Sequence, residues 1–352
     1  SQVSQGASMT LAVNIAQGGS NNVTFRNKII NGAMVIDQRN AGASVTPTSG
    51  DYTLDRWVYQ ATQASKFSIQ QNKGSITAPT GFTNYLGASV SSAVTNGAGD
   101  FFNLSQSIEG FNTADLNWGT ANAKTVTLSF WVYSSLTGTF GGSLQNSAYN
   151  RSYPFSYSIS SASTWTQISI TIAGDTSGTW IGATNGAGVR LNFSLGTGTT
   201  YSGTAGAWAG TNYVGTTGAV SVVGTSGATF YITGVQLEAG TTASPFEYRQ
   251  YGTELALCMR YYINANYATT GSTLGMTCNI TNAVNYHFSF SYLVPMRTSP
   301  TLTWVEWTSS GFSGSSAIFQ QTGYLGSNVY KSAISTTSGG FFLGGYTASA
   351  EL

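Results

Sequence analysis

Residues able to act as acids, bases, nucleophiles or metal ligands are scarce in this 352-residue chain, which holds one histidine and two cysteines. His287 lies on the polar side of an alternating stretch, and no G-x-S-x-G phrase accompanies it. This pattern indicates a solvated or interface histidine rather than a member of a Ser-His-Asp triad. Zinc needs three or four ligands at suitable spacing, which Cys258, Cys278 and His287 do not provide. We expect two reduced, buried thiols and no cofactor.

Carboxylates offer a second chemistry, because two of them can hydrolyse a glycosidic bond. Asp100, Glu109 and Asp115 are the most closely spaced acidic group. No repeat of fixed period, typical of long β-helical bodies, accompanies them. No glycine-rich loop leads into a helix to hold phosphate either. Asp175, within GDTSG, predicts an Asx turn, with calcium binding as the alternative. We expect no enzymatic activity.

Sugar binding is the ligand chemistry that the sequence favours, because saccharides stack on aromatic rings and form hydrogen bonds with polar side chains. Two loops, 146–153 and 201–213, combine both residue types. The candidate contacts are Tyr149, Arg151, Tyr153, Trp208, Asn212 and Tyr213, with Asn146, Asn150 and Tyr201 beside them. The alternative for each loop is packing beneath a sheet. The loop from 312 to 324 is a third possible site.

The composition excludes several classes of protein. Charged residues make up 7% of the chain and the net charge is +1, so we expect no nucleic-acid or anionic-lipid partner. Hydrophobic residues make up 41% and aromatics 13%, which is typical of a folded chain rather than a disordered one. No apolar run approaches the length of a membrane span, and no signal peptide opens the sequence. A polar, uncharged surface of this kind suits a fixed assembly.

Short alternating stretches separated by glycine-rich turns predict an all-β fold, with an antiparallel jelly-roll sandwich as the leading arrangement. In residues 125–133 the apolar side chains alternate most cleanly, and 285–292 alternates strictly with aromatic residues on one side. Strands are also expected at 25–30, 34–38, 220–223 and 229–237, with a bulge at Gly234.

One helix is expected at 253–260, with Thr253 as its N-cap. It separates the sandwich from a smaller β domain rich in aromatic residues. Some of those aromatics are expected to lie between subunits. Near the start of the sandwich, Arg56 is expected either in a surface pair with Asp51 or Asp55, or buried at the edge of the sheet.

Several phrases, taken together, resemble bacteriophage tail-fibre and related virion surface proteins. They are NKIINGAMVIDQRN, DYTLDRW, VTLSFWV, TWTQISITIAGDTSGTW, GVQLEAGTTASPFEYRQYGTELALCMRYY and the terminal TASAEL. The resemblance covers roughly residues 27–352. It implies a carbohydrate-binding-like jelly roll, a short helix and a C-terminal β domain, and it brings no catalytic residues.

The resemblance also implies a domain organisation and partners. Residues 1–26 would form an arm that attaches to other virion proteins, with Leu11, Val13 and Ile15 as anchors; the alternative is a flexible N-terminal tail. Residues 27–250 would form the jelly roll, 251–262 a helical connector, and 263–352 the C-terminal domain. We expect a homotrimeric tail-fibre subunit, assembled in the bacterial host cytoplasm, that binds host surface glycan. The alternative is an architectural virion part without a ligand: a head fibre, capsid decoration or tail adaptor.

Overall fold

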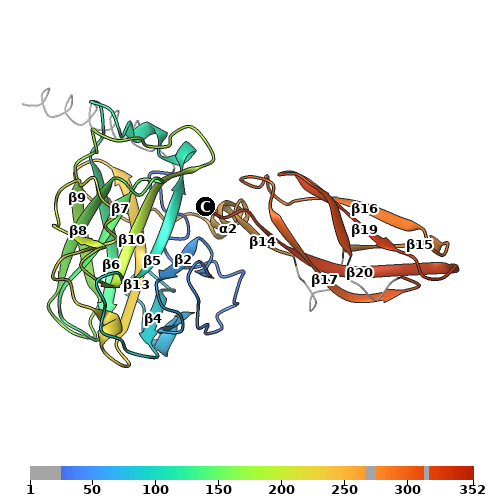
Figure 1. Cartoon of the computed structure of the whole chain (residues 1–352), viewed down its shortest axis with the longest axis horizontal. Helices are drawn as coiled ribbons and strands as arrows, with labels where there is room; N and C mark the ends of the chain where they lie inside the picture. The colour runs from blue at the N-terminus through green and yellow to red at the C-terminus, as the bar shows by residue number, and fades with distance from the viewer. Residues whose placement is uncertain (1–24, 266–273, 313–316) are drawn as a thin grey trace, which may run out of the picture.

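The computed structural model describes residues 25–265, 274–312 and 317–352, which form two β domains side by side (Figure 1). The predicted anchors Leu11, Val13 and Ile15 lie outside the described residues. The only α-helix in the described ranges, α2 (Tyr251–Met259), lies between the two domains, and the C-terminus ends beside it. The prediction of an all-β chain with one short helix and a smaller C-terminal β domain is therefore confirmed.

The larger domain is a sandwich of two antiparallel sheets, one of six and one of five strands. The first sheet has the order β1 (Tyr52–Leu54), β2 (Trp57–Ala61), β5 (Phe101–Glu109), β10 (Ala187–Thr197), β7 (Gly138–Gln145) and β8 (Ser152–Ile159). The second has the order β3 (Phe67–Gln71), β4 (Leu86–Val90), β13 (Thr229–Ala239), β6 (Val126–Ser134) and β9 (Thr166–Ile172). The chain passes repeatedly from one sheet to the other, which is how a jelly roll is connected.

The inner faces of these sheets form one continuous core, because apolar residues alternate along the strands. On β6, the side chains of Val126, Leu128, Phe130 and Val132 are all buried, as the alternation predicts. On β13, the pairing with β6 shifts between Thr233 and Gln236, so the predicted bulge at Gly234 is present. Gly234 has φ +60, and a Cβ there would lie 2.5 Å from the Phe82 ring.

Three segments of the sandwich differ from the sequence prediction. Residues 25–38 form no strand, and side-chain hydrogen bonds hold them instead. Residues 220–223 include the 3-10 turn η4 (Val222–Gly224) rather than a strand. Strand β7 was not predicted, because four of its eight residues are glycine or serine and weaken the apolar alternation. The remaining short elements are η1 (Lys73–Ser75), η2 (Gly110–Asn112), η3 (Ala114–Leu116), β11 (Ser202–Gly203) and β12 (Gly215–Thr216).

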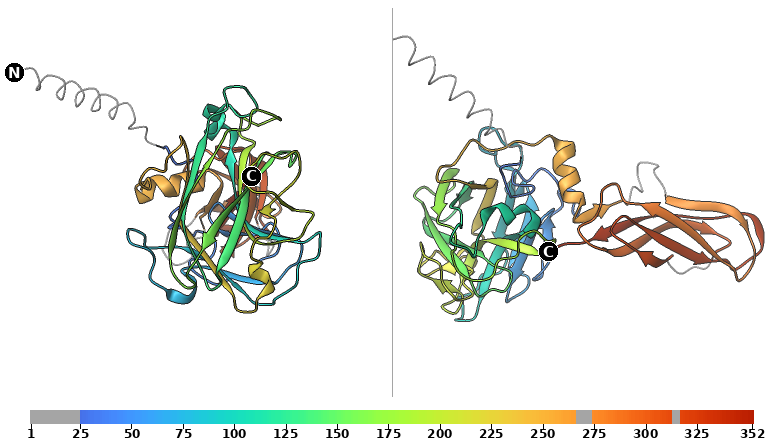
Figure 2. Two further views of the ribbon diagram at one scale, coloured as in Figure 1. Left: turned by 90° about the vertical axis from the view of Figure 1, so that its left-hand side faces the viewer. Right: turned by 90° about the horizontal axis from the view of Figure 1, so that it is seen from above.

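The smaller domain packs a four-stranded sheet against a three-stranded one (Figure 2). The first contains β14 (Tyr262–Asn264), β15 (Leu274–Ile280), β17 (Thr301–Ser310) and β20 (Thr337–Ser349). The second contains β16 (Asn285–Ser291), β18 (Ile318–Thr322) and β19 (Gly326–Ser332). Trp304 and Phe312 are among the aromatic residues that lie in the core between these sheets.

Buried ion pairs hold the two domains together. Arg56 is 1% exposed and pairs with Glu351, which also accepts a hydrogen bond from Arg39 at 2.5 Å. Of the two alternatives for Arg56, burial is confirmed and the surface pair with Asp51 or Asp55 is wrong. A partner 295 residues away cannot be found from neighbouring acids. Helix α2 begins at Tyr251 after an N-cap at Gln250, so the predicted N-cap at Thr253 is three residues too late. Cys258 is buried as expected, whereas Cys278 is half-buried; both are free thiols.

Candidate functional site

The two loops predicted to bind sugar lie against each other at the outer edge of the first sheet. Ser152 and Ala209 exchange backbone hydrogen bonds, and the Ser152 hydroxyl donates to the Thr211 carbonyl at 2.6 Å. The Gln145 side chain donates to Asn212 Oδ1 at 2.7 Å and to the Tyr213 carbonyl at 2.9 Å. The structure thus joins two segments about 60 residues apart into one surface, which the sequence alone did not predict.

Tyr153 and Trp208 pack within this surface rather than project from it. Tyr153 is buried, and its ring centroid lies 5.2 Å from that of Trp208. Trp208 also meets Trp118 and Trp180 edge-on, and its indole donates to the Ala173 carbonyl at 2.8 Å. Burial raises the pKa of Tyr153. Packing, the alternative considered for these loops, therefore accounts for both residues.

Arg151 forms a bidentate ion pair with Asp175. Arg151 Nε and Nη2 donate to the two carboxylate oxygens at 2.7 Å each, and this hydrogen bonding raises the pKa of the guanidinium. Asp175 is buried and also accepts from the Ser177 amide at 3.1 Å, which is the predicted Asx turn. Both oxygens face N–H donors, an arrangement opposite to that of a calcium ligand. The pair fixes the base of loop 146–153.

Tyr149 is the predicted sugar contact that remains most open, with 39% of its surface exposed. The turn below it is set by Asn146, whose Oδ1 accepts from the amides of Asn150 and Arg151 at 3.1 Å. Arg190 lies 4.9 Å from the Tyr149 ring centroid and donates to Gln60 Oε1 at 3.2 Å. We call Gln60, Tyr149, Arg190, Asn212 and Tyr213 the Tyr149 surface.

Beneath the Tyr149 surface, a row of polar side chains crosses the outer face of strands β5, β10 and β7. Asn192 accepts from Ser105 at 2.7 Å and Asn103 at 3.0 Å, and donates to Ser143 at 3.0 Å and Gln145 at 2.8 Å. These residues are fully buried, and Asn103 Oδ1 has no hydrogen-bond partner in the described structure. Sequence analysis missed this row, although the polar positions alternate at 103, 105 and 107 and at 190, 192 and 194.

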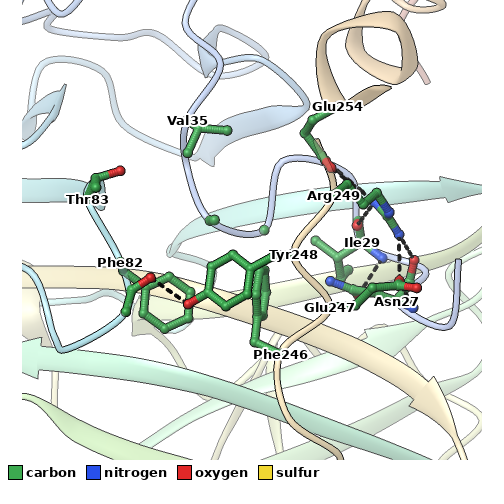
Figure 3. Close-up of a pocket in the computed structure, with 13 residues that line it drawn as sticks. Asn27, Ile29, Val35, Phe82, Thr83, Phe246, Glu247, Tyr248, Arg249 and Glu254 are labelled. Carbon is green, nitrogen blue, oxygen red and sulfur yellow. Dashed lines mark hydrogen bonds and ion pairs between the residues drawn. The ribbon is translucent and has the colours of Figure 1, made fainter. Parts of the chain in front are cut away.

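A second candidate is a pocket of about 230 Å³ between residues 25–35 and the segment after β13 (Figure 3). One wall consists of the rings of Phe82, Phe246 and Tyr248, whose centroids lie 4.9–5.5 Å apart. The Tyr248 hydroxyl donates to the Gly81 carbonyl at 2.6 Å. Residues 246–250 form no strand.

The charged residues of this pocket hold residues 25–31 against the rest of the sandwich by hydrogen bonds. Glu247 accepts from the amides of residues 25, 26 and 27 at 2.6, 3.1 and 2.8 Å. Glu254 accepts from the Asn31 amide, and Arg249 lies between the two carboxylates at 3.4 Å from each. Both carboxylates accept hydrogen bonds from N–H donors. They therefore hold residues 25–31 in place and are not arranged as an acid–base pair.

Each of the acids considered for glycoside hydrolysis accepts hydrogen bonds from different residues. Asp100 accepts from the Gly97 amide, Thr62 and Gln63, and these hydrogen bonds lower its pKa. Burial alone would raise the pKa of Glu109, but hydrogen bonds from Arg260 and Tyr261 lower it. Asp115 pairs with Lys28 at 2.7 Å.

The remaining chemistry-bearing residues do not gather into a site. His287 is exposed on β16 and lies 3.2 Å from Asn328 Oδ1, as its place on the polar side of the strand predicts. In the part of the chain that the structure describes, no three His, Cys, Asp or Glu residues are grouped as metal ligands. Nor is any described helix long and apolar enough to cross a membrane.

No family model and no curated protein matches the chain. Among solved structures, the enzymatically active domain of tailspike protein 4 of bacteriophage CBA120 is similar, with 13% identity and a TM-score of 0.32. The match covers 61% of this chain but only 22% of that one. A putative sugar binding protein from Bacteroides thetaiotaomicron matches at 14% identity over 61% of this chain and 100% of its own, with a TM-score of 0.34. A carbohydrate-binding module described as CBM4 matches at 14% over 60% of this chain and 98% of its own, with a TM-score of 0.30. The assignment of the sandwich rests on its own strand order.

Proposed function

We propose that this protein is a bacteriophage virion subunit whose sandwich binds host surface glycan at the Tyr149 surface. The observation that carries the proposal is the row of buried amides ending at this surface. Asn192 links Asn103 to Gln145, and Gln145 holds Asn212 at the rim. Such a row fixes the direction of the polar groups before a ligand arrives, which reduces the ordering cost of binding. Tyr149 adds an exposed aromatic ring for the apolar face of a sugar.

The ligand class follows from the charges of the site. Arg190 is the one charged residue of the Tyr149 surface, and the Tyr149 ring and Gln60 already engage it. The other polar groups are amides and phenols, which recognise hydroxyl groups by hydrogen bonding. We therefore propose a neutral oligosaccharide as the ligand. The carboxylates of Asp100, Glu109 and Asp115 each accept a hydrogen bond from another side chain, which fits binding without hydrolysis.

The proposed setting is a tail fibre, in which several weak sites on one particle act together. In this setting the chain would form a homotrimer, and residues 1–26, including Leu11, Val13 and Ile15, would contact other virion proteins. The resemblance of the sequence phrases to virion surface proteins supports this setting. Localisation in the virion, after assembly in the host cytoplasm, is part of the same proposal.

The test measures binding of labelled, purified protein to host and non-host cells and to an array of neutral glycans. Tyr149→Ala and Asn212→Ala should each weaken host binding by about tenfold, because each removes one of a few contacts of the site. Tyr251→Ala is the matched control, since Tyr251 is an exposed tyrosine on α2, outside the Tyr149 surface. Unchanged binding in both surface variants would place the glycan elsewhere.

An architectural virion part without a ligand is the second candidate, and the distribution of charge favours it. Several of the few charged residues form ion pairs within the chain, such as Arg249 with Glu247 and Glu254, and Arg56 with Glu351. A chain that uses its charges internally leaves a neutral surface, which suits permanent contact with neighbouring subunits. A folded oligomer that binds neither cells nor glycans would favour this second function.

A further inference from the structure

A cleft of about 400 Å³ opens where the sandwich meets the C-terminal domain. The sandwich contributes Phe111 from η2 and Asn185 from the loop before β10. The C-terminal domain contributes residues 295–299 and Tyr324, which precedes β19. Arg260, the C-cap residue of α2, lies between the two walls. We call this site the junction cleft; its volume is within the range of small-ligand sites.

Two guanidinium groups, those of Arg260 and Arg297, line the junction cleft, and no carboxylate is among its lining residues. Arg260 pairs with Glu109 through Nε at 2.9 Å and Nη2 at 2.5 Å, yet 32% of its side chain stays exposed. Glu109 is fully buried behind this pair.

Arg297 belongs to none of the ion pairs among the described residues. Its guanidinium donates to three carbonyl oxygens, those of Ala350 at 2.7 Å, Asn185 at 2.8 Å and Glu351 at 2.7 Å. A guanidinium has five N–H donors, so these bonds do not use all of them. Burial lowers the pKa of Arg297, which is expected where a positive charge is desolvated without full compensation.

Two exposed aromatic rings complete the lining of the cleft. Phe111 is 57% exposed and Tyr324 is 55% exposed. Neither ring takes part in an aromatic pair within the described structure, whereas rings in the core of the C-terminal domain, such as Phe312, Phe342 and Tyr346, do. Rings that contribute little to the core, beside guanidinium groups, form the kind of lining that binds a ligand with both an apolar face and a negative group.

We propose that the junction cleft binds a saccharide that carries a carboxylate group. Arg297 and Arg260 would receive the carboxylate, because a planar guanidinium matches a carboxylate in shape and charge. Phe111 and Tyr324 would contact the apolar face of the ring, and Asn185 would position its hydroxyl groups. This site extends the proposed function, since it also takes a sugar, but it differs from the Tyr149 surface in place and in charge.

The experiment titrates the full chain with trigalacturonate, and with its methyl ester, by isothermal titration calorimetry at low salt. The acid should bind about tenfold more tightly than the neutral ester, because the ester removes the charge-assisted hydrogen bonds. Its affinity should fall as salt is added. Arg297→Gln should remove this preference for the acid. Phe111→Ala combined with Tyr324→Ala should weaken binding of both probes.

The double aromatic variant keeps the test informative if Arg297→Gln impairs folding, since both rings are exposed. Equal affinity for acid and ester, or no effect of the double variant, overturns the proposal. Binding of glycerol 3-phosphate without trigalacturonate also overturns it, because the site would then recognise phosphate. Tyr149→Ala separates the two sites: it should weaken neutral glycan binding by about tenfold and leave trigalacturonate binding unchanged.

Discussion

Strands β6 and β16 show the same alternation in sequence but differ in burial. On β6, Val126, Leu128, Phe130 and Val132 are completely or almost completely buried. On β16, Tyr286, Phe288 and Phe290 face the core of the C-terminal domain but are only half-buried. β6 is an interior strand of a five-stranded sheet and faces a six-stranded sheet, whereas β16 is the edge strand of a three-stranded sheet and faces a four-stranded one. Period-2 alternation therefore predicts which side of a strand faces inward, whereas the depth of the core depends on the rest of the fold.

This difference predicts two levels of stability within one chain. The sandwich has one continuous core and is expected to fold by itself. The C-terminal domain has a thinner core, in which inward-facing rings of β16 are only half-buried. The junction, through Arg39, Arg56, Arg260 and their acidic partners, is then expected to stabilise the smaller domain.

The largest expected effect comes from replacing matched aromatic residues in the two cores. Phe130→Ala should lower the free energy of unfolding of the sandwich by about 3–5 kcal/mol, because it leaves a closed cavity beside Tyr157 and Phe193. Phe288→Ala should cost the C-terminal domain about 1–2 kcal/mol, since its ring is already partly in water. Calorimetry of each variant checks this. Equal losses would mean that the two cores are equally closed.

The next effect concerns the junction. Glu351→Gln should cost about 3 kcal/mol, because it leaves the buried charge of Arg56 without its carboxylate. The loss of stability should appear in the C-terminal domain. Its unfolding transition would then separate from the transition of the sandwich. Asp115→Asn is the control, as it breaks the more exposed pair with Lys28. A single unchanged transition in Glu351→Gln would show that the junction does not couple the domains.

A pH effect is expected from Asp55, on the sandwich side of the junction. Burial raises the pKa of Asp55 to about 6, above the value of 3.8 for a free side chain. The folded state therefore binds more protons than the unfolded state between about pH 4 and 6, and the free energy of unfolding falls as pH rises through this window. The pKa difference corresponds to at most about 3 kcal/mol. Chemical denaturation of wild type and Asp55→Asn from pH 4 to 7 measures the difference in slope; parallel curves would contradict the prediction.

The smallest effect is expected on the outer face of β16. His287→Ala should change the free energy of unfolding by no more than about 0.5 kcal/mol, because the ring is exposed and contacts Asn328 and Tyr330 at the surface. Thermal unfolding of the isolated, full chain measures it. A loss above 2 kcal/mol would indicate that this face is buried against another subunit.

The elements most accurately predicted were those set by local chemistry. The bulge at Gly234 follows from a glycine within an apolar alternation, and α2 follows from a run of helix-forming residues after Gly252. Strand β7 was missed because glycines such as Gly141 and Gly142 are required by neighbours that come from elsewhere in the chain. A Cβ on Gly141 would lie 2.4 Å from Thr216, and one on Gly142 would lie 2.1 Å from the Asn192 carbonyl oxygen.

The candidate site was predicted in part. The two loops were identified from their aromatic and amide content. The sequence did not predict that Asn212 and Gln145 would meet, or that Arg190 would lie over Tyr149. Arg190 comes from the middle of a strand, where a single charged residue gives no sign of the loop it will contact. Tyr153 and Trp208 had the composition of sugar contacts, and only their position in the fold showed that they pack.

By itself, the sequence determined the class of fold, the side of each clear strand that faces inward, and the neutral character of the surface, since these depend on residue type and short-range period. Only the tertiary structure decided the pairing of Arg56 with Glu351, the buried row around Asn192, and the junction cleft. These features join segments from tens to hundreds of residues apart. Their geometry depends on the order of strands in the sheets, which no local pattern of residues encodes.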